Sequence, residues 1–309
     1  MLGDPLGVVS DALRHKLVDL GGPVHYIDFG GEGDPVVMVH GLGGNALNWM
    51  DVGPGFAERH HTVALDLAGF GQTPLFDRSA TVGANAALVT RFIEKLFGEP
   101  VTLVGNSMGG HITVLVAADH PELVRRAILV DPAIPGVHVR RPDRAMVAVM
   151  AALSVPGLAE TVLERRLRSV GAADLVRQTL ALVVADPSRL SDQIVDAHVR
   201  LTREREHLGP QNNRAFVQAT RSIGLRMADP RFWQSARKVK APVLVIHGEL
   251  DRVIPLAAAR ELVHRIPGWQ LKVIEGVGHV PMMETPALFL RVVNDYIDTT
   301  IAHAPATIP

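Results

Sequence analysis

The sequence contains no cysteine, few aromatic residues (5%) and almost no net charge. Without cysteine, the chain cannot form disulfides, cysteine-based metal sites or a cysteine nucleophile. Its 31 lysine and arginine residues, against 32 aspartate and glutamate residues, give a formal net charge of -1 over 309 residues. A chain without a basic excess is a poor candidate for nucleic-acid binding, so we expect no nucleic-acid partner.

The sequence also lacks a long hydrophobic run. The longest one, residues 145–155, ends at Pro156 and Gly157. It is shorter than the ~20 residues that cross a bilayer. Near the N-terminus, Asp4 and Asp11 interrupt the apolar residues that a secretory signal would need. We therefore expect a cytoplasmic protein without a transmembrane segment, present as a monomer or a homodimer.

Apolar residues are nevertheless abundant, with 47% hydrophobic and only 20% charged residues. Several short runs are β-rich and continuously apolar, which is typical of strands buried on both faces of a parallel sheet. Helical patterns fall between them, and this alternation predicts a doubly wound α/β fold. The expected strands are 24–29, 36–40, 62–67, 101–105, 127–130, 243–247 and 271–274, and the expected helices are 82–97, 107–119, 256–265 and 286–301.

One interval of more than a hundred residues, between Asp131 and Ala241, has no convincing strand. It contains helical patterns instead, at 144–153, 158–170 and 172–184. A connection in an α/β fold is normally a few residues plus one helix, so this interval is too long for a simple connection. We interpret it as a helical cap. The predicted division is a core of residues 1–134 and 223–309 and a cap of residues 135–222.

A candidate nucleophile follows the apolar strand expected at 101–105. Residues 105–109 read Gly-Asn-Ser-Met-Gly, which matches the G-x-S-x-G nucleophile elbow between a strand and a helix. The glycines leave room for a sharp turn that projects Ser107 above the sheet. The N–H of Met108, at the start of the following helix, can then face an oxyanion. The pattern predicts Ser107 as nucleophile and Met108 as one oxyanion donor.

A serine nucleophile needs a general base that is oriented by an acid. Asp251 and His279 each lie in a loop just after an expected strand, and the chain order Ser107, Asp251, His279 is the one that accompanies this elbow. We therefore predict that Asp251 orients His279 and that His279 takes the serine proton. Asp131 also ends a strand and is a rival acid, although the following proline favours a turn role. Glu249 is a weaker rival.

The second oxyanion donor is expected in the glycine-rich loop after strand 36–40. We predict that it is the N–H of Leu42, since glycines on both sides let the backbone approach a substrate closely. His40 is interpreted as a structural hydrogen-bonding residue. No spacing typical of metal ligands surrounds the histidines, so no metal site is predicted. The residues expected to contact substrate are Gly41, Gly43, Trp49, Met146, Met150, Val253, Val280 and Met282, with packing on the core as the alternative role of the two cap methionines.

Together with His40-Gly41, the turn Asp66-Leu-Ala-Gly69-Phe-Gly71 and Gly278-His279, these motifs resemble those of the α/β-hydrolase fold superfamily over nearly the whole chain. The resemblance implies a mainly parallel eight-stranded sheet flanked by helices, a helical cap inserted after the sixth strand, an active site between core and cap, and no cofactor. The motifs are specific for the fold and weak for the substrate.

The segment Gly-Asn-Ser107-Met-Gly-Gly is also similar to that of carbon–carbon bond hydrolases that act on ring-cleavage products. Those enzymes usually carry a tryptophan soon after the catalytic histidine, whereas residues 280–283 are Val-Pro-Met-Met here. This difference favours a carboxylesterase for small or medium apolar esters, with carbon–carbon hydrolysis and a hydrolase-fold ligand receptor as alternatives. A third alternative is dinucleotide binding, because Gly41-x-Gly43-x-x-Ala46 follows a strand and Asp66 ends the next one.

Overall fold

A computed structural model describes residues 13–136, 165, 169–206 and 209–302 of the chain. Its centre is an eight-stranded sheet with the order β1-β2-β4-β3-β5-β6-β7-β8. The pairs β1–β2 and β2–β4 are antiparallel, and the remaining pairs are parallel. The strands are β1 (Arg14–Asp19), β2 (Pro23–Gly30), β3 (Val36–Val39), β4 (Thr62–Leu65), β5 (Val101–Asn106), β6 (Val124–Val130), β7 (Val243–Gly248) and β8 (Gln270–Ile274). The predicted mainly parallel α/β sheet is confirmed.

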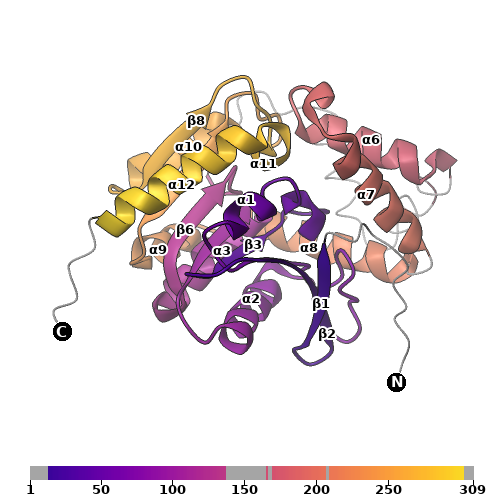
Figure 1. The fold of residues 1–309 in the computed structure, drawn as a ribbon, viewed down its shortest axis with the longest axis horizontal. Helices are drawn as coiled ribbons and strands as arrows, with labels where there is room; N and C mark the ends of the chain where they lie inside the picture. Colours follow the sequence, from indigo (N-terminus) through magenta and orange to yellow (C-terminus); the bar gives the residue numbers. More distant parts are fainter. Residues whose placement is uncertain (1–12, 137–164, 166–168, 207–208, 303–309) are drawn as a thin grey trace.

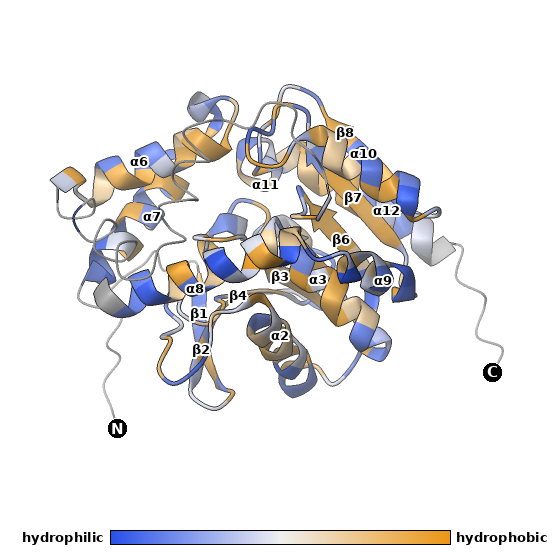
Figure 2. Cartoon of the chain, turned by 180° about the vertical axis from the view of Figure 1, so that it is seen from behind, coloured by the Kyte–Doolittle hydropathy of each residue, from blue (hydrophilic) through white to orange (hydrophobic). Residues whose placement is uncertain are grey.

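The central strands are apolar because both of their faces are covered. Every residue of β3 is buried, and its side chains alternate between the two sides of the sheet. Val37 and Val39 belong to one hydrophobic core cluster, while Val36 and Met38 belong to the other. This period of two explains why the strand reads as a continuous hydrophobic run. Strands β6 and β7 are likewise hydrophobic along their length, as their orange colour in Figure 2 shows.

Two sets of helices cover the sheet (Figure 1). The core on one side contains side chains of α2 (Val82–Leu96), α3 (Met108–Asp119), α9 (Arg231–Lys238) and α10 (Leu256–Arg265). The core on the other side contains side chains of the short helices η1 (Ala46–Trp49), α1 (Gly53–Ala57) and α11 (Pro281–Glu284), and of the long helix α12 (Pro286–Ala302). A short helix η2 (Pro121–Leu123) leads into β6. Among the described helices, none combines the length and the apolarity needed to cross a membrane.

The long interval between β6 and β7 is helical where the structure describes it. It contains α6 (Ala172–Val183), η3 (Pro187–Arg189), α7 (Asp192–Glu204) and α8 (Gly209–Met227) before α9. Helices α6 and α7 pack on each other (Figure 1), and α7 also contacts η1 at the sheet. The helix expected at 172–184 is therefore confirmed. The helix expected at 144–153, most of the one at 158–170, and the candidate contacts Met146 and Met150 lie outside the described residues.

Helix α8 joins this insert to the core. The side chain of Gln218 accepts a hydrogen bond from the N–H of Ala80, and Oγ of Ser222 accepts one from the N–H of Val82. Both acceptors thus hold the loop that leads into α2 and the start of that helix. The boundary of the cap at residue 222 stays a prediction.

Candidate active site

Ser107 occupies a strained turn between β5 and α3. Its backbone has φ +55° and ψ -115°, a combination that is costly for a residue with a side chain. A Cβ atom on Gly105 would lie 2.3 Å from the carbonyl oxygen of Gly109, and one on Gly109 would lie 2.4 Å from that of Val39. Only glycine fits these two positions, which is why the turn requires the spacing read from the sequence.

Backbone hydrogen bonds hold this turn against the neighbouring strand. The N–H of Ser107 donates to the carbonyl of Val130 at 2.9 Å. The Ser107 carbonyl accepts from the N–H groups of Ala133, at 3.0 Å, and His111, at 3.1 Å. Strain in a backbone persists only where its surroundings determine the conformation. The turn is therefore fixed by β6 and the segment that follows it.

His279 and Asp251 meet in the loops after β8 and β7. Nδ1 of His279 lies 2.6 Å from Oδ2 of Asp251, and both side chains are buried. The other carboxylate oxygen of Asp251 accepts hydrogen bonds from the N–H groups of Val253 and Ile254. Burial opposes ionisation of Asp251, but the imidazole of His279 and its hydrogen bond outweigh that effect, so the pKa of Asp251 lies below its ordinary value. Asp251 is thus an ionised partner for the imidazole.

Asn106 links the Ser107 turn to the His279 loop. Its side-chain amide donates to the carbonyl of His279 at 3.1 Å and to that of Val130 at 3.2 Å. Gly41 lies on the other side of the turn, where a Cβ atom would be 3.0 Å from Cβ of Ser107. The structure therefore brings together the elbow, the His279 loop and the glycine-rich loop after β3, three segments in which the sequence predicts site residues.

His40 fixes the orientation of the Gly41 peptide. It is completely buried, and its Nδ1–H donates to the carbonyl of Gly41 at 2.7 Å, while Nε2 accepts from the N–H of Leu67 at 3.0 Å. Burial lowers the pKa of His40, in agreement with a neutral ring that accepts at Nε2. In a trans peptide the N–H of Leu42 points opposite to the Gly41 carbonyl, and hence away from the His40 ring.

The predicted substrate contacts differ in their exposure. Gly43 has a positive φ of 75° and lies against the ring of Phe216 on α8, so the glycine loop touches the insert. Val253 is half-buried. Three of the predicted contacts are buried in the core on the side of α11 and α12, namely Trp49, Val280 and Met282. The Trp49 ring packs there on Phe289. Packing accounts for these three side chains, and their contact with a ligand stays a prediction.

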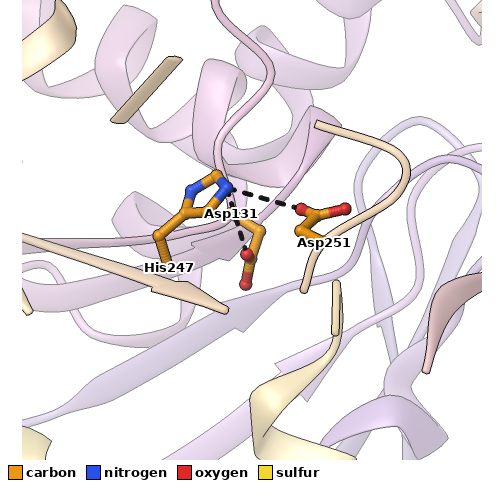
Figure 3. Close-up of side chains that lie close together, drawn as sticks. All are labelled: Asp131, His247 and Asp251. Atoms are coloured by element: carbon orange, nitrogen blue, oxygen red, sulfur yellow. Dashed lines mark ion pairs between the residues drawn. The ribbon is translucent and has the colours of Figure 1, made fainter. Parts of the chain in front are cut away.

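Asp131 lies close to His247 and Asp251 (Figure 3). It is fully buried, has φ +46°, and accepts the N–H of Gly248 at 2.9 Å. Burial and the charge of Asp251 raise the pKa of Asp131 well above its ordinary value. Burial and its charged neighbour therefore favour the protonated form of Asp131, whereas His279 favours the ionised form of Asp251. Asp251 is the carboxylate that hydrogen-bonds to His279.

The same three side chains are close enough to hold a metal ion, since their ligand atoms lie within 4.8 Å of one another. However, the nitrogen of His247 that faces both carboxyl groups is Nε2, at 3.6 Å from each. Nε2 lies 2.9 Å from the carbonyl oxygen of Ile254 and must carry the proton that this acceptor receives. A protonated nitrogen cannot ligate a metal. With this nitrogen protonated, the donor set of the cluster does not fit a metal site.

Asp66 is occupied by protein donors. It is buried, accepts hydrogen bonds from the N–H groups of Ala46 and Gln72, and pairs with Nδ1 of His25 at 2.6 Å. A dinucleotide site would need this carboxylate to face a ribose. The hydrogen bonds of Asp66 instead fix the start of η1 and the turn after β4. The carboxylate is therefore not available to bind the ribose of a dinucleotide.

Sequence reasoning did not find Glu284, whose buried side chain hydrogen-bonds the loop of His279 to the insert. An acidic residue directly after the apolar residues 280–283 was the available signal. It could not be interpreted, because three of its partners are main-chain N–H groups, two of which lie about a hundred positions earlier in the chain.

Comparison with known proteins places this geometry among hydrolases. A family model described as the alpha/beta hydrolase fold matches residues 34–286. A 2-hydroxy-6-oxo-6-(2'-aminophenyl)hexa-2,4-dienoic acid hydrolase of Metapseudomonas resinovorans is 28% identical over 297 residues, which cover 93% of this chain and 92% of that protein.

Two solved structures are similar along nearly the whole chain. A membrane phospholipase A, described as a bacterial virulence factor, has 26% identity and a TM-score of 0.73, with 93% of this chain and 86% of that one covered. A serine hydrolase involved in carbazole degradation has 25% identity and a TM-score of 0.71, with 93% and 100% covered. Proteins of this architecture thus include enzymes named for different substrates.

Proposed function

Because the chain belongs to the α/β-hydrolase fold family, we propose that it is a serine hydrolase that cleaves carboxylic esters through an acyl-enzyme on Ser107. The observation that carries this proposal is the 2.6 Å hydrogen bond between His279 and Asp251, in a loop that Asn106 ties to the strained Ser107 turn. A serine, a base and an acid in this chain order form the constellation that acyl transfer requires.

The proposed reaction begins when Nε2 of His279 takes the proton of Ser107 and Oγ attacks the ester carbonyl. Asp251 holds the opposite ring nitrogen and stabilises the imidazolium that forms. The N–H groups of Leu42 and Met108 bind the oxyanion, each from a rigid position: Met108 begins α3, and the Leu42 peptide is oriented by His40. His279 then protonates the leaving alcohol, and water resolves the acyl-enzyme by the same route.

The proposed substrates are small or medium apolar esters that bind between the core and a cap formed by residues 135–222. Support comes from the apolar contact between the glycine-rich loop and α8, where Leu42 and Phe216 are both partly buried against the same core cluster. An apolar wall beside the oxyanion loop suits an acyl chain.

The second candidate is hydrolysis of a carbon–carbon bond, which the similarity to the dienoic acid hydrolase favours. Asn106, the residue that suggested this chemistry, makes two backbone hydrogen bonds and is explained by its bracing of the His279 loop. Met282 and Met283, near the place where a tryptophan would be expected, are buried. These two observations favour the ester.

Initial rates on p-nitrophenyl esters from acetate to palmitate test the proposal, with a ring-cleavage dienoate assayed in parallel. Ser107→Ala is the matched control for background hydrolysis. Turnover of esters that depends on Ser107 and has a chain-length optimum is the expected result. Turnover of the dienoate alone would assign the second candidate, and equal ester rates for both proteins would exclude the serine mechanism.

A further inference from the structure

The connection between α6 and α7 of the insert is bound directly to the loop that carries His279. The N–H of His279 donates to the carbonyl of Val183, the last residue of α6, at 2.7 Å. Six residues later, Nη1 of Arg189 donates to the carbonyl of Gly276 at 2.8 Å. These two contacts, one at each end, place residues 183–189 along the loop of the proposed general base.

The buried carboxylate of Glu284 lies between these two segments. Its side chain has no exposed surface. Oε2 accepts hydrogen bonds from the N–H of Gly278, at 2.9 Å, and from the N–H of Ala185, at 3.0 Å. Oε1 accepts from the N–H of Asp186 at 3.1 Å and pairs with Arg189 at 3.3 Å. One donor therefore comes from the His279 loop, and the other three come from the insert.

The backbones of the two segments lie so close at Gly278 that a side chain would not fit between them. A Cβ atom on Gly278 would lie 2.6 Å from the nitrogen of Ala185 and 2.7 Å from the carbonyl oxygen of Val183. Glycine is therefore required at the position before His279 for the insert to dock. The short helix α11 then turns the chain back, so that Glu284 reaches the amide of Gly278.

The main chain of His279 is consequently fixed from two sides. Its N–H is held by the insert through Val183, and its carbonyl is held by the elbow through Asn106. A movement of residues 183–189 would pull on the backbone from which the imidazole projects. Glu284 opposes that movement, because a buried carboxylate is stable only while its donors stay in place.

We propose that Glu284 is a positioning residue that clamps the α6–α7 connection to the His279 loop, so that the insert and the general base form one rigid unit. This inference rests on the proposed role of His279. It assigns the carboxylate no contact with substrate and no proton transfer. Its effect on the reaction is the alignment of His279 relative to Ser107.

The variant Glu284→Gln tests this clamp with little change in volume. The amide replaces one acceptor oxygen by an NH₂ group, which faces main-chain donors and cannot accept from them. We expect kcat to fall by about tenfold or more with KM changed by less than about threefold, because misalignment of a base affects the chemical step and not ground-state binding. Glu261→Gln on α10, where the carboxylate forms an exposed pair with Arg265, is the matched control and should behave as the unmodified protein.

Arg189→Met is a milder second variant in case Glu284→Gln does not fold. The side chain of Arg189 is 40% exposed and forms an ion pair with the buried carboxylate of Glu284. Its loss should lower kcat in the same direction but by less, while the three N–H groups still bind Glu284. An effect on KM alone in either variant would contradict the clamp and indicate a role in shaping the pocket.

Hydrogen exchange followed by mass spectrometry gives a readout that does not depend on the reaction. In both variants, peptides covering residues 183–190 and 274–285 should exchange faster together, while the β1–β2 hairpin stays unchanged. Unaltered exchange in both peptides would overturn the clamp even if kcat fell. If the unmodified protein has no Ser107-dependent turnover, the proposed function fails, and the exchange data still decide whether the clamp exists.

Discussion

The Nδ1 atom of His279 lies 2.6 Å from Oδ2 of Asp251, and Oδ1 of the same carboxylate receives the N–H groups of Val253 and Ile254. Both oxygens of Asp251 are thus engaged, and the carboxylate cannot rotate without losing several bonds. Because an ionised carboxylate only accepts, the proton of the neutral imidazole resides on Nδ1. Nε2 is left free as the basic nitrogen.

Replacement of Asp251 by asparagine should reverse this tautomer. The side-chain NH₂ would donate to Nδ1, and the ring proton would move to Nε2, where it blocks proton transfer from Ser107. We expect Asp251→Asn to lower kcat by about 10³-fold or more. Steady-state rates on a short p-nitrophenyl ester measure this, with Asp298→Asn, which changes an exposed partner of Arg59, as control. A rate within tenfold of the unmodified protein would indicate that Asp131, and not Asp251, is the acid that orients His279.

Replacement of Asp131 by asparagine should have little effect on activity at neutral pH. Burial and the charge of Asp251 raise the pKa of Asp131 well above its ordinary value, which favours the neutral form of this carboxyl. An asparagine can keep the bond from the N–H of Gly248 and remain uncharged. We expect kcat within about threefold of the unmodified protein. Asp131→Ala, which leaves that N–H without a partner, is the contrasting variant and should lose about 1–3 kcal/mol of stability.

The pH dependence of stability should also report on Asp131. Its pKa in the folded protein is raised, so the unfolded chain loses this proton at about pH 4 while the folded chain retains it. As pH rises from about 4 towards the raised pKa, the group therefore destabilises the folded state, and Asp131→Asn removes this dependence. Thermal melts between pH 4 and 8 should show the variant gaining Tm relative to the unmodified protein. A constant difference would mean that Asp131 is ionised in both states.

Relief of strain at the elbow should be measurable. Ser107 has φ +55°, a region that glycine adopts without steric cost and alanine does not. We expect Ser107→Gly to be more stable than Ser107→Ala by about 1 kcal/mol, which is roughly 2–3 °C in Tm for a chain of this size. Both variants should be inactive, so melting curves separate strain from catalysis. Equal melting temperatures would contradict stored strain at this position.

The strands of the core were predictable because burial on both faces leaves continuous apolar runs. β1 was missed for the opposite reason: it is an edge strand whose residues are partly or fully exposed, and Arg14, Lys16 and Asp19 interrupt any apolar pattern. A strand that pairs on one side only needs no hydrophobic signature. The helices at 82–97 and 256–265 were predictable from their periodicity and agree with α2 and α10 within one residue.

The candidate site was predictable where a local motif specifies it. The Ser107 elbow is encoded by neighbouring glycines, so the sequence alone indicates it. The sequence favoured Asp251 over Asp131 through chain order and the proline after Asp131, although each aspartate follows a strand. Which carboxylate reaches Nδ1 of His279 depends on the three-dimensional arrangement, and there it is Asp251. Glu284 acts on distant main-chain groups, which leave no trace in residue types.

The proposed mechanism depends on Ser107 acting as a nucleophile that His279 activates. The most direct measurement is the intact mass of the protein after treatment with a fluorophosphonate, followed by peptide mapping. We expect one adduct, located on Ser107, with none in Ser107→Ala and much slower labelling in His279→Ala. Labelling of Ser107→Ala to the same extent, or no adduct on the unmodified protein, would contradict this mechanism.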